Sequence, residues 1–217
     1  MKKSLANLKQ AEIFALLAMF FLIMLVSSQN SMQLPATRSA YPPSIPIPSD
    51  ALYFETAKAF PEEGPNYLRE YVKENIVPKL KNQLDRYDVN MIEVIGHTDG
   101  SPVNGRGTLD RKLLNELAGL NTADSNIEYN ELVEKFRKLQ AGSNADLGLI
   151  RALIVVKTLQ DLLLRDEYFS QKIEAFKAYS AGQLYSPSSE PFAAPANSNS
   201  DPQRRRIEVR FTKWNPT

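Results

Sequence analysis

Hydrophobic residues are unevenly distributed along this chain, and the densest run lies near the N-terminus. The stretch from Ile13 to Val26 (IFALLAMFFLIMLV) is entirely apolar, with lysines before it and polar residues after it. A membrane-spanning helix needs roughly 20 such residues, and extending the run to residues 11–28 nearly reaches that length. The pattern fits either a cleaved signal peptide or a retained transmembrane helix whose lysines stay in the cytoplasm.

An acidic side chain at the start of the apolar run favours the retained helix. Glu12 directly precedes Ile13, and a carboxylate in a membrane helix is costly enough to indicate a function. We therefore predict that residues 1–28 form a cytoplasmic N-terminus and one transmembrane helix. The alternative role for Glu12 is to cap the helix start, where the helix dipole favours negative charge.

Prolines mark the next segment, residues 29–49, at positions 35, 42, 43, 46 and 48. Proline fixes φ and removes a hydrogen-bond donor, so this stretch is expected to form neither a helix nor a central strand. We predict a semi-extended spacer of at most about 3.1 Å per residue, or roughly 60 Å in all.

From residue 50 onward, strand-like and helix-like patterns alternate. Periodicity predicts strands at 51–55, 91–96, 173–181 and 207–212, and helices at 64–87, 129–140 and 145–165. Pro78 lies inside the first helix and predicts a kink or a break. The order of the main elements predicts an α+β domain over residues 50–217, with two helices on one side of a mixed sheet. Residues 101–143, which contain the helix at 129–140, form an insertion.

The composition argues against the common kinds of enzyme. There are no cysteines, which excludes disulfides, thiol catalysis, cysteine-bound metal and a lipid anchor on cysteine. The presence of only one histidine, His97, argues against a histidine metal site and against a Ser-His-Asp triad. A net charge of +1 argues against nucleic acid as a partner. We expect no enzymatic activity, no cofactor and no metal.

Three short motifs in the domain are the most informative: IGHTDG (95–100), NADLGLIRA (144–152) and DPQRRRIEV (201–209). In this order they resemble the OmpA-like peptidoglycan-binding domain, whose pattern is Thr-Asp, then Asn-x-x-Leu-x-x-x-Arg-Ala, then an Arg-Arg-hydrophobic-Glu strand. The resemblance implies a β-α-β-α-β-β sandwich that binds the cell wall. For the insertion it leaves two possibilities: a surface elaboration, or a contact for dimerisation or wall docking.

The same resemblance implies which residues bind. Peptidoglycan stem peptides in many bacteria carry diaminopimelate, whose free end has one carboxylate and one ammonium. An arginine fork suits the carboxylate and an aspartate suits the ammonium. The residues that match these roles are Arg151 and Asp99, with Thr98 and Asn144 beside them. Asn144 is also the predicted N-cap of the long helix.

The alternative to ligand binding is a purely structural role for these residues. In it, Asp99 only closes a turn and Arg151 pairs with Asp99 or another acid. The other polar residues of the motifs are predicted to be framework: His97 as a hydrogen-bonding residue at a strand end, and Arg205, Arg206 and Glu208 in ion pairs beside the site.

The N-terminal segment resembles a second family. AEIFALLAMFFLIML (11–25) is similar to the start of the flagellar stator subunit MotB, in which an Ala-Asp pair is followed, eight residues after the acid, by Phe-Phe-Leu. Here Glu12 stands in place of aspartate, and Phe20 and Phe21 fit the step. The resemblance implies the peptidoglycan-anchored B subunit of an ion-driven motor in the bacterial inner membrane. Glu12 would take and release an ion, a proton by default.

The resemblance also implies partners and location. The partners would be a MotA-like multi-span channel subunit, a second copy of the chain, peptidoglycan and the inner membrane, with the folded domain in the periplasm. Flagellar stators and Zorya-type anti-phage systems both fit. MotB proteins usually have an amphipathic plug helix after the span, and residues 32–49 show no such pattern, which favours the non-flagellar branch. The alternative function is a non-conducting OmpA-like tether to the wall.

Overall fold

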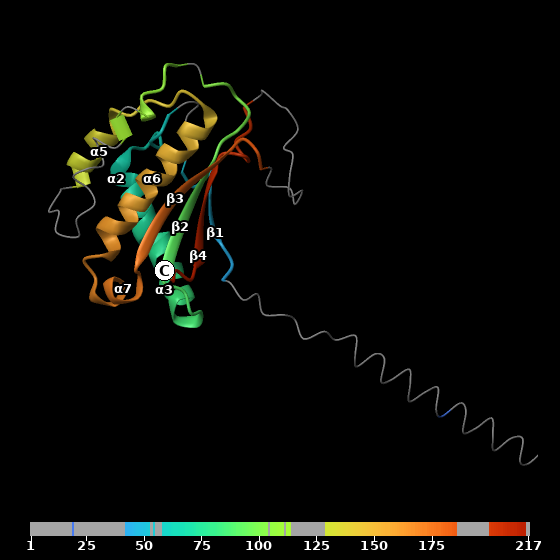
Figure 1. Cartoon of the computed structure of the whole chain (residues 1–217), viewed down its shortest axis with the longest axis vertical. Coiled ribbons are helices and arrows are strands. Elements are labelled where there is room, and N and C mark those ends of the chain that lie inside the picture. The colour runs from blue at the N-terminus through green and yellow to red at the C-terminus, as the bar shows by residue number, and fades with distance from the viewer. Residues whose placement is uncertain are drawn as a thin grey trace, which may run out of the picture. The chain divides into compact units, whose positions relative to one another are not determined.

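The computed structural model describes residues 42–52, 54, 58–103, 105–110, 112–113, 129–185 and 200–215, together with Met19 (Figure 1). Apart from Met19, the predicted transmembrane helix, with Glu12, and the first part of the predicted spacer lie outside these residues. Within them, no helix is both long and apolar enough to cross a membrane. The elements below belong to a compact unit that comprises residues 41–217.

A four-stranded mixed sheet forms the centre of this unit. Its strands lie in the order β1 (Ile45–Pro48), β4 (Arg206–Thr212), β2 (Met91–His97) and β3 (Ala175–Gly182). β2 runs parallel to β3 and antiparallel to β4, and β1 runs antiparallel to β4. The predicted alternation along the last strand is confirmed, because Ile207, Val209 and Phe211 are all buried on one face.

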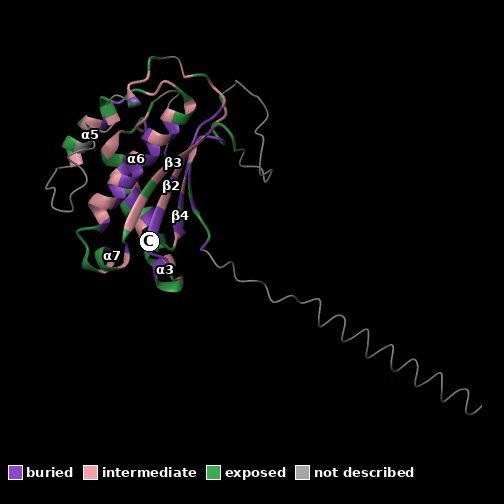
Figure 2. Ribbon diagram, in the orientation of Figure 1, coloured by how far each residue is buried: buried purple, intermediate pink, exposed green. Residues whose placement is uncertain are grey.

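Helices pack on this buried face of the sheet (Figures 1 and 2). The first helical segment consists of α2 (Pro65–Tyr71), the π-helical turn η1 (Val72–Ile76) and α3 (Val77–Arg86). The long helix α6 (Asn144–Leu163) packs on β2 and β3, and α5 (Tyr129–Arg137) packs against α6. The short α7 (Glu167–Lys172) precedes β3. The predicted α+β architecture is thus confirmed for the folded domain.

The first strand is not where the sequence pattern placed it. Ala51 and Leu52 lie in a turn and a bend, and Phe54 has no strand conformation, so the prediction of a strand at 51–55 is wrong for its described residues. The strand is β1, inside the range 29–49 predicted to be a spacer. Proline is confined to edge strands because it cannot donate to a neighbour. β1 is an edge strand, and its two prolines alternate with the buried Ile45 and Ile47.

Pro78 disturbs the first helical segment in a specific way. The π-helical turn η1 lies immediately before the turn that contains Pro78, and α3 then continues with this proline in its first turn. Proline lacks an N–H and crowds the carbonyl four residues earlier, and a widened turn relieves both problems. The predicted disruption therefore takes the form of a π turn, with the helix continuing beyond it.

Two glycines allow α6 to approach β2 through the backbone alone. A Cβ on Gly96 would lie 2.0 Å from the carbonyl oxygen of Gly148, and a Cβ on Gly148 would lie 2.4 Å from Ser180 Oγ. No side chain fits at either position. The contact fixes the distance between α6 and the end of β2, one helical turn before Arg151 and just before Asp99.

We expect Gly96→Ala to lower the free energy of unfolding by about 1–3 kcal/mol, because the added methyl pushes α6 away from the sheet. Urea denaturation of the purified protein measures the change. Gly105→Ala is the matched control: its Cβ would lie 3.5 Å from the nearest atom, which is ordinary contact. Equal stability of the Gly96 variant and the wild type would contradict the close backbone contact.

Candidate ligand-binding site

Charged and polar side chains gather where β2 ends and β4 begins. Thr98 and Asp99 follow β2, Arg204 and Arg205 precede β4, and Arg151 comes from α6; all five are buried. The antiparallel register pairs the last residue of β2 with the first residue of β4. Residues after the first strand therefore lie beside residues before the second, and the fold brings all three sequence motifs together.

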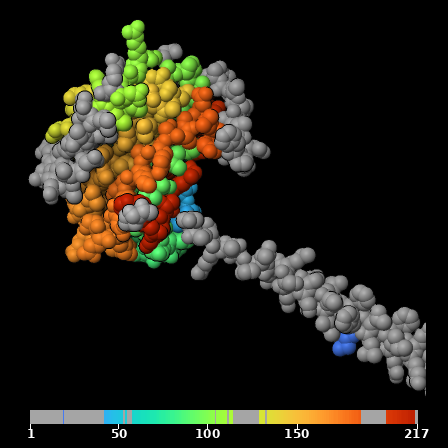
Figure 3. Space-filling model, in the orientation of Figure 1, coloured from blue at the N-terminus to red at the C-terminus, as the bar shows by residue number. Residues whose placement is uncertain are grey.

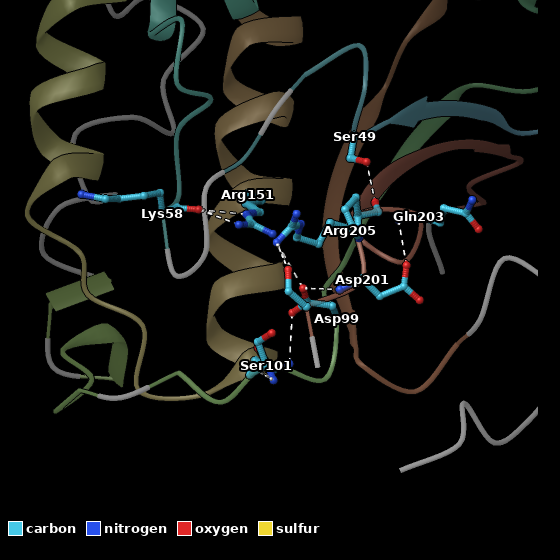
Figure 4. Close-up of polar contacts among 11 residues, drawn as sticks. Ser49, Lys58, Asp99, Ser101, Arg151, Asp201, Gln203 and Arg205 are labelled. Carbon is cyan, nitrogen blue, oxygen red and sulfur yellow. Dashed lines mark hydrogen bonds and ion pairs between the residues drawn. The ribbon is translucent and has the colours of Figure 1, made fainter. Parts of the chain in front are cut away.

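The Asp99 carboxylate is held from several sides (Figure 4). Oδ1 accepts a hydrogen bond from the backbone N–H of Ser101 at 3.2 Å, and Oδ2 accepts one from the N–H of Asp201 at 3.1 Å. Nη1 of Arg205 lies 3.2 Å from Oδ2, in an ion pair whose side chains are only 4% and 6% exposed. Asp99 does close a turn, as the structural alternative supposed, and its ion pair is with Arg205.

Arg151 is even more deeply buried, with 1% of its surface exposed. Its Nε and Nη2 donate to the carbonyl oxygen of Lys58 at 3.0 and 2.8 Å. The guanidinium also lies over the ring of Phe54, 4.6 Å from the ring centroid. Burial, followed by the positive charge of Arg205, lowers the pKa of Arg151 to about 9, while Asp99 acts in the opposite direction. Arg151 therefore stays protonated at neutral pH.

Positive charge is in excess among the buried groups of this cluster. Within the described residues, three buried arginines (Arg151, Arg204 and Arg205) accompany one buried carboxylate, Asp99. Arg204 also donates to the carbonyl oxygen of Gln183. The cluster is therefore suited to a ligand that brings a negative group.

Several buried polar atoms at this end of the sheet have no hydrogen-bond partner within the part of the chain that the structure describes. They are Nδ1 of His97, Oγ1 of Thr98, Nε of Arg204 and Nη1 of Arg206. Leaving such an atom unsatisfied costs about 1–3 kcal/mol, and native proteins seldom do so. Most of these atoms can donate, so a ligand with oxygen acceptors would satisfy them.

Asn144 is not the N-cap of α6 that the sequence predicted. The N-cap of α6 is Ser143, which has an extended backbone and whose Oγ accepts from the N–H of Asp146 at 3.1 Å. Asn144 is the first residue of the helix, so the N-cap prediction is wrong by one position. Its Nδ2 donates to the carbonyl oxygen of Ser101 at 3.0 Å and to Oε1 of Gln183 at 2.7 Å. Asn144 therefore ties the loop after Asp99 to the start of α6.

The predicted framework residues are partly confirmed. His97 Nε2 lies 3.3 Å from Glu208, and Arg210 Nη2 lies 3.1 Å from the same carboxylate. The hydrogen bond with His97 is the main cause that holds the pKa of Glu208 well below its usual value, with help from Arg210 and against the effect of burial. Glu208 therefore stabilises the fold at neutral pH, and this contribution is lost as the pH falls below the ordinary carboxyl range. Arg205, in contrast to the prediction of a framework residue beside the site, pairs with Asp99 and is part of the site.

Two contacts of Arg151 were not expected from the sequence. Phe54 supplies a ring. Lys58 supplies a backbone carbonyl, which every residue has and which the residue type therefore does not predict. No group of three or more side chains that could hold a metal occurs within the described ranges. The site as described is closed, since protein atoms hold both Asp99 and Arg151.

Comparison with known proteins adds a structural match. No protein-family model matches this chain, and no curated protein matches it. Two crystal structures of the periplasmic domain of Helicobacter pylori MotB do match. One is 18% identical over 78% of this chain and 81% of that chain, and the other is 19% identical over 78% and 75%, each with a TM-score of 0.39. At this TM-score the match carries no conclusion about ligand or partner.

Proposed function

We propose that this chain is the peptidoglycan-anchored B subunit of an ion-driven MotA/MotB-like motor complex of the bacterial inner membrane. In this proposal one N-terminal helix spans the membrane, the folded domain lies in the periplasm and binds the wall, and the protein has no catalytic activity. The observation that supports wall binding best is the excess of buried positive charge beside unsatisfied polar atoms. The three motifs of the OmpA-like pattern meet at that place.

The proposed ligand is the free end of diaminopimelate. Its carboxylate would replace the neutral carbonyl of Lys58 on Arg151, because a charged acceptor forms the stronger, charge-assisted hydrogen bond. Its ammonium would share Asp99 with Arg205, while its carboxylate would face the arginines. Binding requires the segment that contains Phe54 and Lys58 to shift, since these residues cover Arg151.

The motor part of the proposal rests on the N-terminal sequence. Glu12, at the start of an apolar run, is the group proposed to take up and release a proton inside a MotA-like partner. A dimer of this chain, held to the wall, would stay fixed while the partner moves. A Zorya-type defence motor is favoured over a flagellar stator because residues 32–49 show no plug-helix pattern. A non-conducting tether would share the wall site and lack the ion step.

Thr98→Val tests the wall site without breaking an ion pair. The variant keeps the side-chain shape and removes a buried hydroxyl with no described partner. We expect the free energy of unfolding to stay the same or rise by about 1 kcal/mol. Binding to purified peptidoglycan should fall about 3- to 10-fold, as for one lost hydrogen bond.

The matched control is Thr158→Val. Thr158 is a fully buried threonine on α6 whose hydroxyl donates to the carbonyl oxygen of Ile154 at 2.8 Å. Its replacement should leave peptidoglycan binding unchanged. Wild-type binding by a folded Thr98→Val variant would remove this hydroxyl from the site, and failure of the wild type to sediment with peptidoglycan would refute wall binding altogether.

A further inference from the structure

A cavity of about 700 Å³ lies beside the site described above. It is bounded by the segment 58–62, by Val103, Gly105 and Arg106, by the end of α5 and by the first turns of α6. We call it the insertion pocket, because much of its wall comes from the insertion 101–143. Figure 3 shows described residues of the insertion (lime green and yellow) on the surface at one end of the domain. Its volume is in the range of pockets that hold small ligands.

The insertion pocket has an apolar floor and a basic rim. Phe136, Leu147 and Ile150 form part of the floor and are buried. Three exposed cations stand on the rim, Lys58, Arg106 and Arg137, against one lining carboxylate, Glu62. Arg137 pairs with Glu134 at 3.1 Å, whereas the structure records no ion pair for Lys58 or Arg106 among the described residues. The lining is suited to a small ligand with apolar groups and a carboxylate.

The same segments of the chain contribute residues to both the pocket and the Asp99–Arg151 site. The carbonyl of Lys58 faces Arg151, while its side chain extends away from that arginine and lines the pocket (Figure 4). Ile150 precedes Arg151 on α6, and Val103 follows the loop that Asp99 closes. The pocket is therefore adjacent to the first site, and a peptide held at that site can continue toward it.

We propose that the insertion pocket is a second subsite that binds the part of the wall peptide preceding diaminopimelate. This inference rests on the proposed wall-binding function. The stem peptide that leads to diaminopimelate contains alanine and a glutamate with a free carboxylate. The methyl group of the alanine would pack on Phe136 and Leu147. The free carboxylate of the glutamate would pair with Lys58 and Arg106. Of the possible roles for the insertion, the inference selects docking to the wall.

Binding of two probes to the full chain in detergent, measured by calorimetry, tests the subsite. The probes are free diaminopimelate, which reaches only the first site, and the tripeptide alanyl-γ-glutamyl-diaminopimelate, which reaches both. The wild type should bind the tripeptide at least about fivefold more tightly than free diaminopimelate, as for a few partly exposed charge contacts. The variant Arg106→Ala should lose most of that gain and bind free diaminopimelate as the wild type does.

The control is Arg86→Ala, which removes one exposed arginine from α3, outside the pocket lining. It should keep the full gain. The subsite is refuted if the wild type binds both probes equally, or if the pocket variant keeps the gain. If the wild type binds neither probe, the proposed wall-binding function fails, and the subsite fails with it. If free diaminopimelate binds and only the gain is absent, the failure belongs to the subsite alone.

Discussion

Asp99→Ala should lower the free energy of unfolding by about 3–5 kcal/mol and abolish binding to peptidoglycan. The carboxylate is the ion-pair partner of Arg205 at 3.2 Å, and both side chains are almost fully buried. Removing one member of a buried pair leaves the other charge uncompensated, which is the costly case. Here the remaining guanidinium would lie near a second positive charge, that of Arg151. The backbone N–H groups of Ser101 and Asp201 would lose their acceptor as well.

Loss of binding in that variant alone would be ambiguous, because unfolding also abolishes binding. The double variant Asp99→Leu, Arg205→Met separates the two effects. Replacing both members of a buried ion pair by apolar residues is often neutral for stability. The double variant should therefore lose less stability than Asp99→Ala, with the remaining loss due to the N–H groups of Ser101 and Asp201. It should still fail to bind, because the aspartate that receives the ammonium is gone. Urea denaturation and sedimentation with purified peptidoglycan measure the two properties. A stable double variant that sediments like the wild type would place the ligand elsewhere.

The sequence was sufficient for those parts of the fold that periodicity encodes. The alternation of Ile207, Val209 and Phe211 identified both the last strand and its buried face. The apolar spacing of the long helix placed α6 within two residues of its observed ends. β1 was missed because its pattern is two isoleucines between prolines. Only the pairing with β4 at a sheet edge, a contact with the far end of the chain, makes that pattern a strand.

The candidate site was predictable to a similar depth. Motif order identified Thr98, Asp99 and Arg151 as neighbours, and the structure brings them to one end of the sheet. The partners of the charges were not predictable. Arg151 donates to a backbone carbonyl, which every residue has, so Lys58 gave no signal. Arg205 pairs with Asp99 because of the register between β2 and β4, which a motif does not specify. The cap of α6 was misplaced by one residue because serine and asparagine are both good N-caps.

Glu12→Gln should abolish all ion-driven activity of the assembled complex. Glutamine keeps the size and the polarity of the side chain but can neither carry a charge nor release a proton. Glu12→Asp keeps the titrating group and only shortens its reach, so partial activity should remain. The measurement is motor output with the MotA-like partner, either torque or phage restriction according to the system in which the gene lies. Both variants should still assemble with the partner and stay in the inner membrane with an unprocessed N-terminus.

The alternative roles of the same residue predict different results. If Glu12 only caps a helix start, Gln should be almost harmless, because an exposed interaction between a charge and the helix dipole contributes about 0.3–1 kcal/mol. If the apolar run is a signal peptide, the purified periplasmic protein should begin near Gln29 and lack Glu12 altogether. Full activity of the Gln variant in an intact, membrane-bound complex would exclude ion coupling through Glu12. The wall-binding domain would then belong to a tether that holds a membrane protein to peptidoglycan without moving anything.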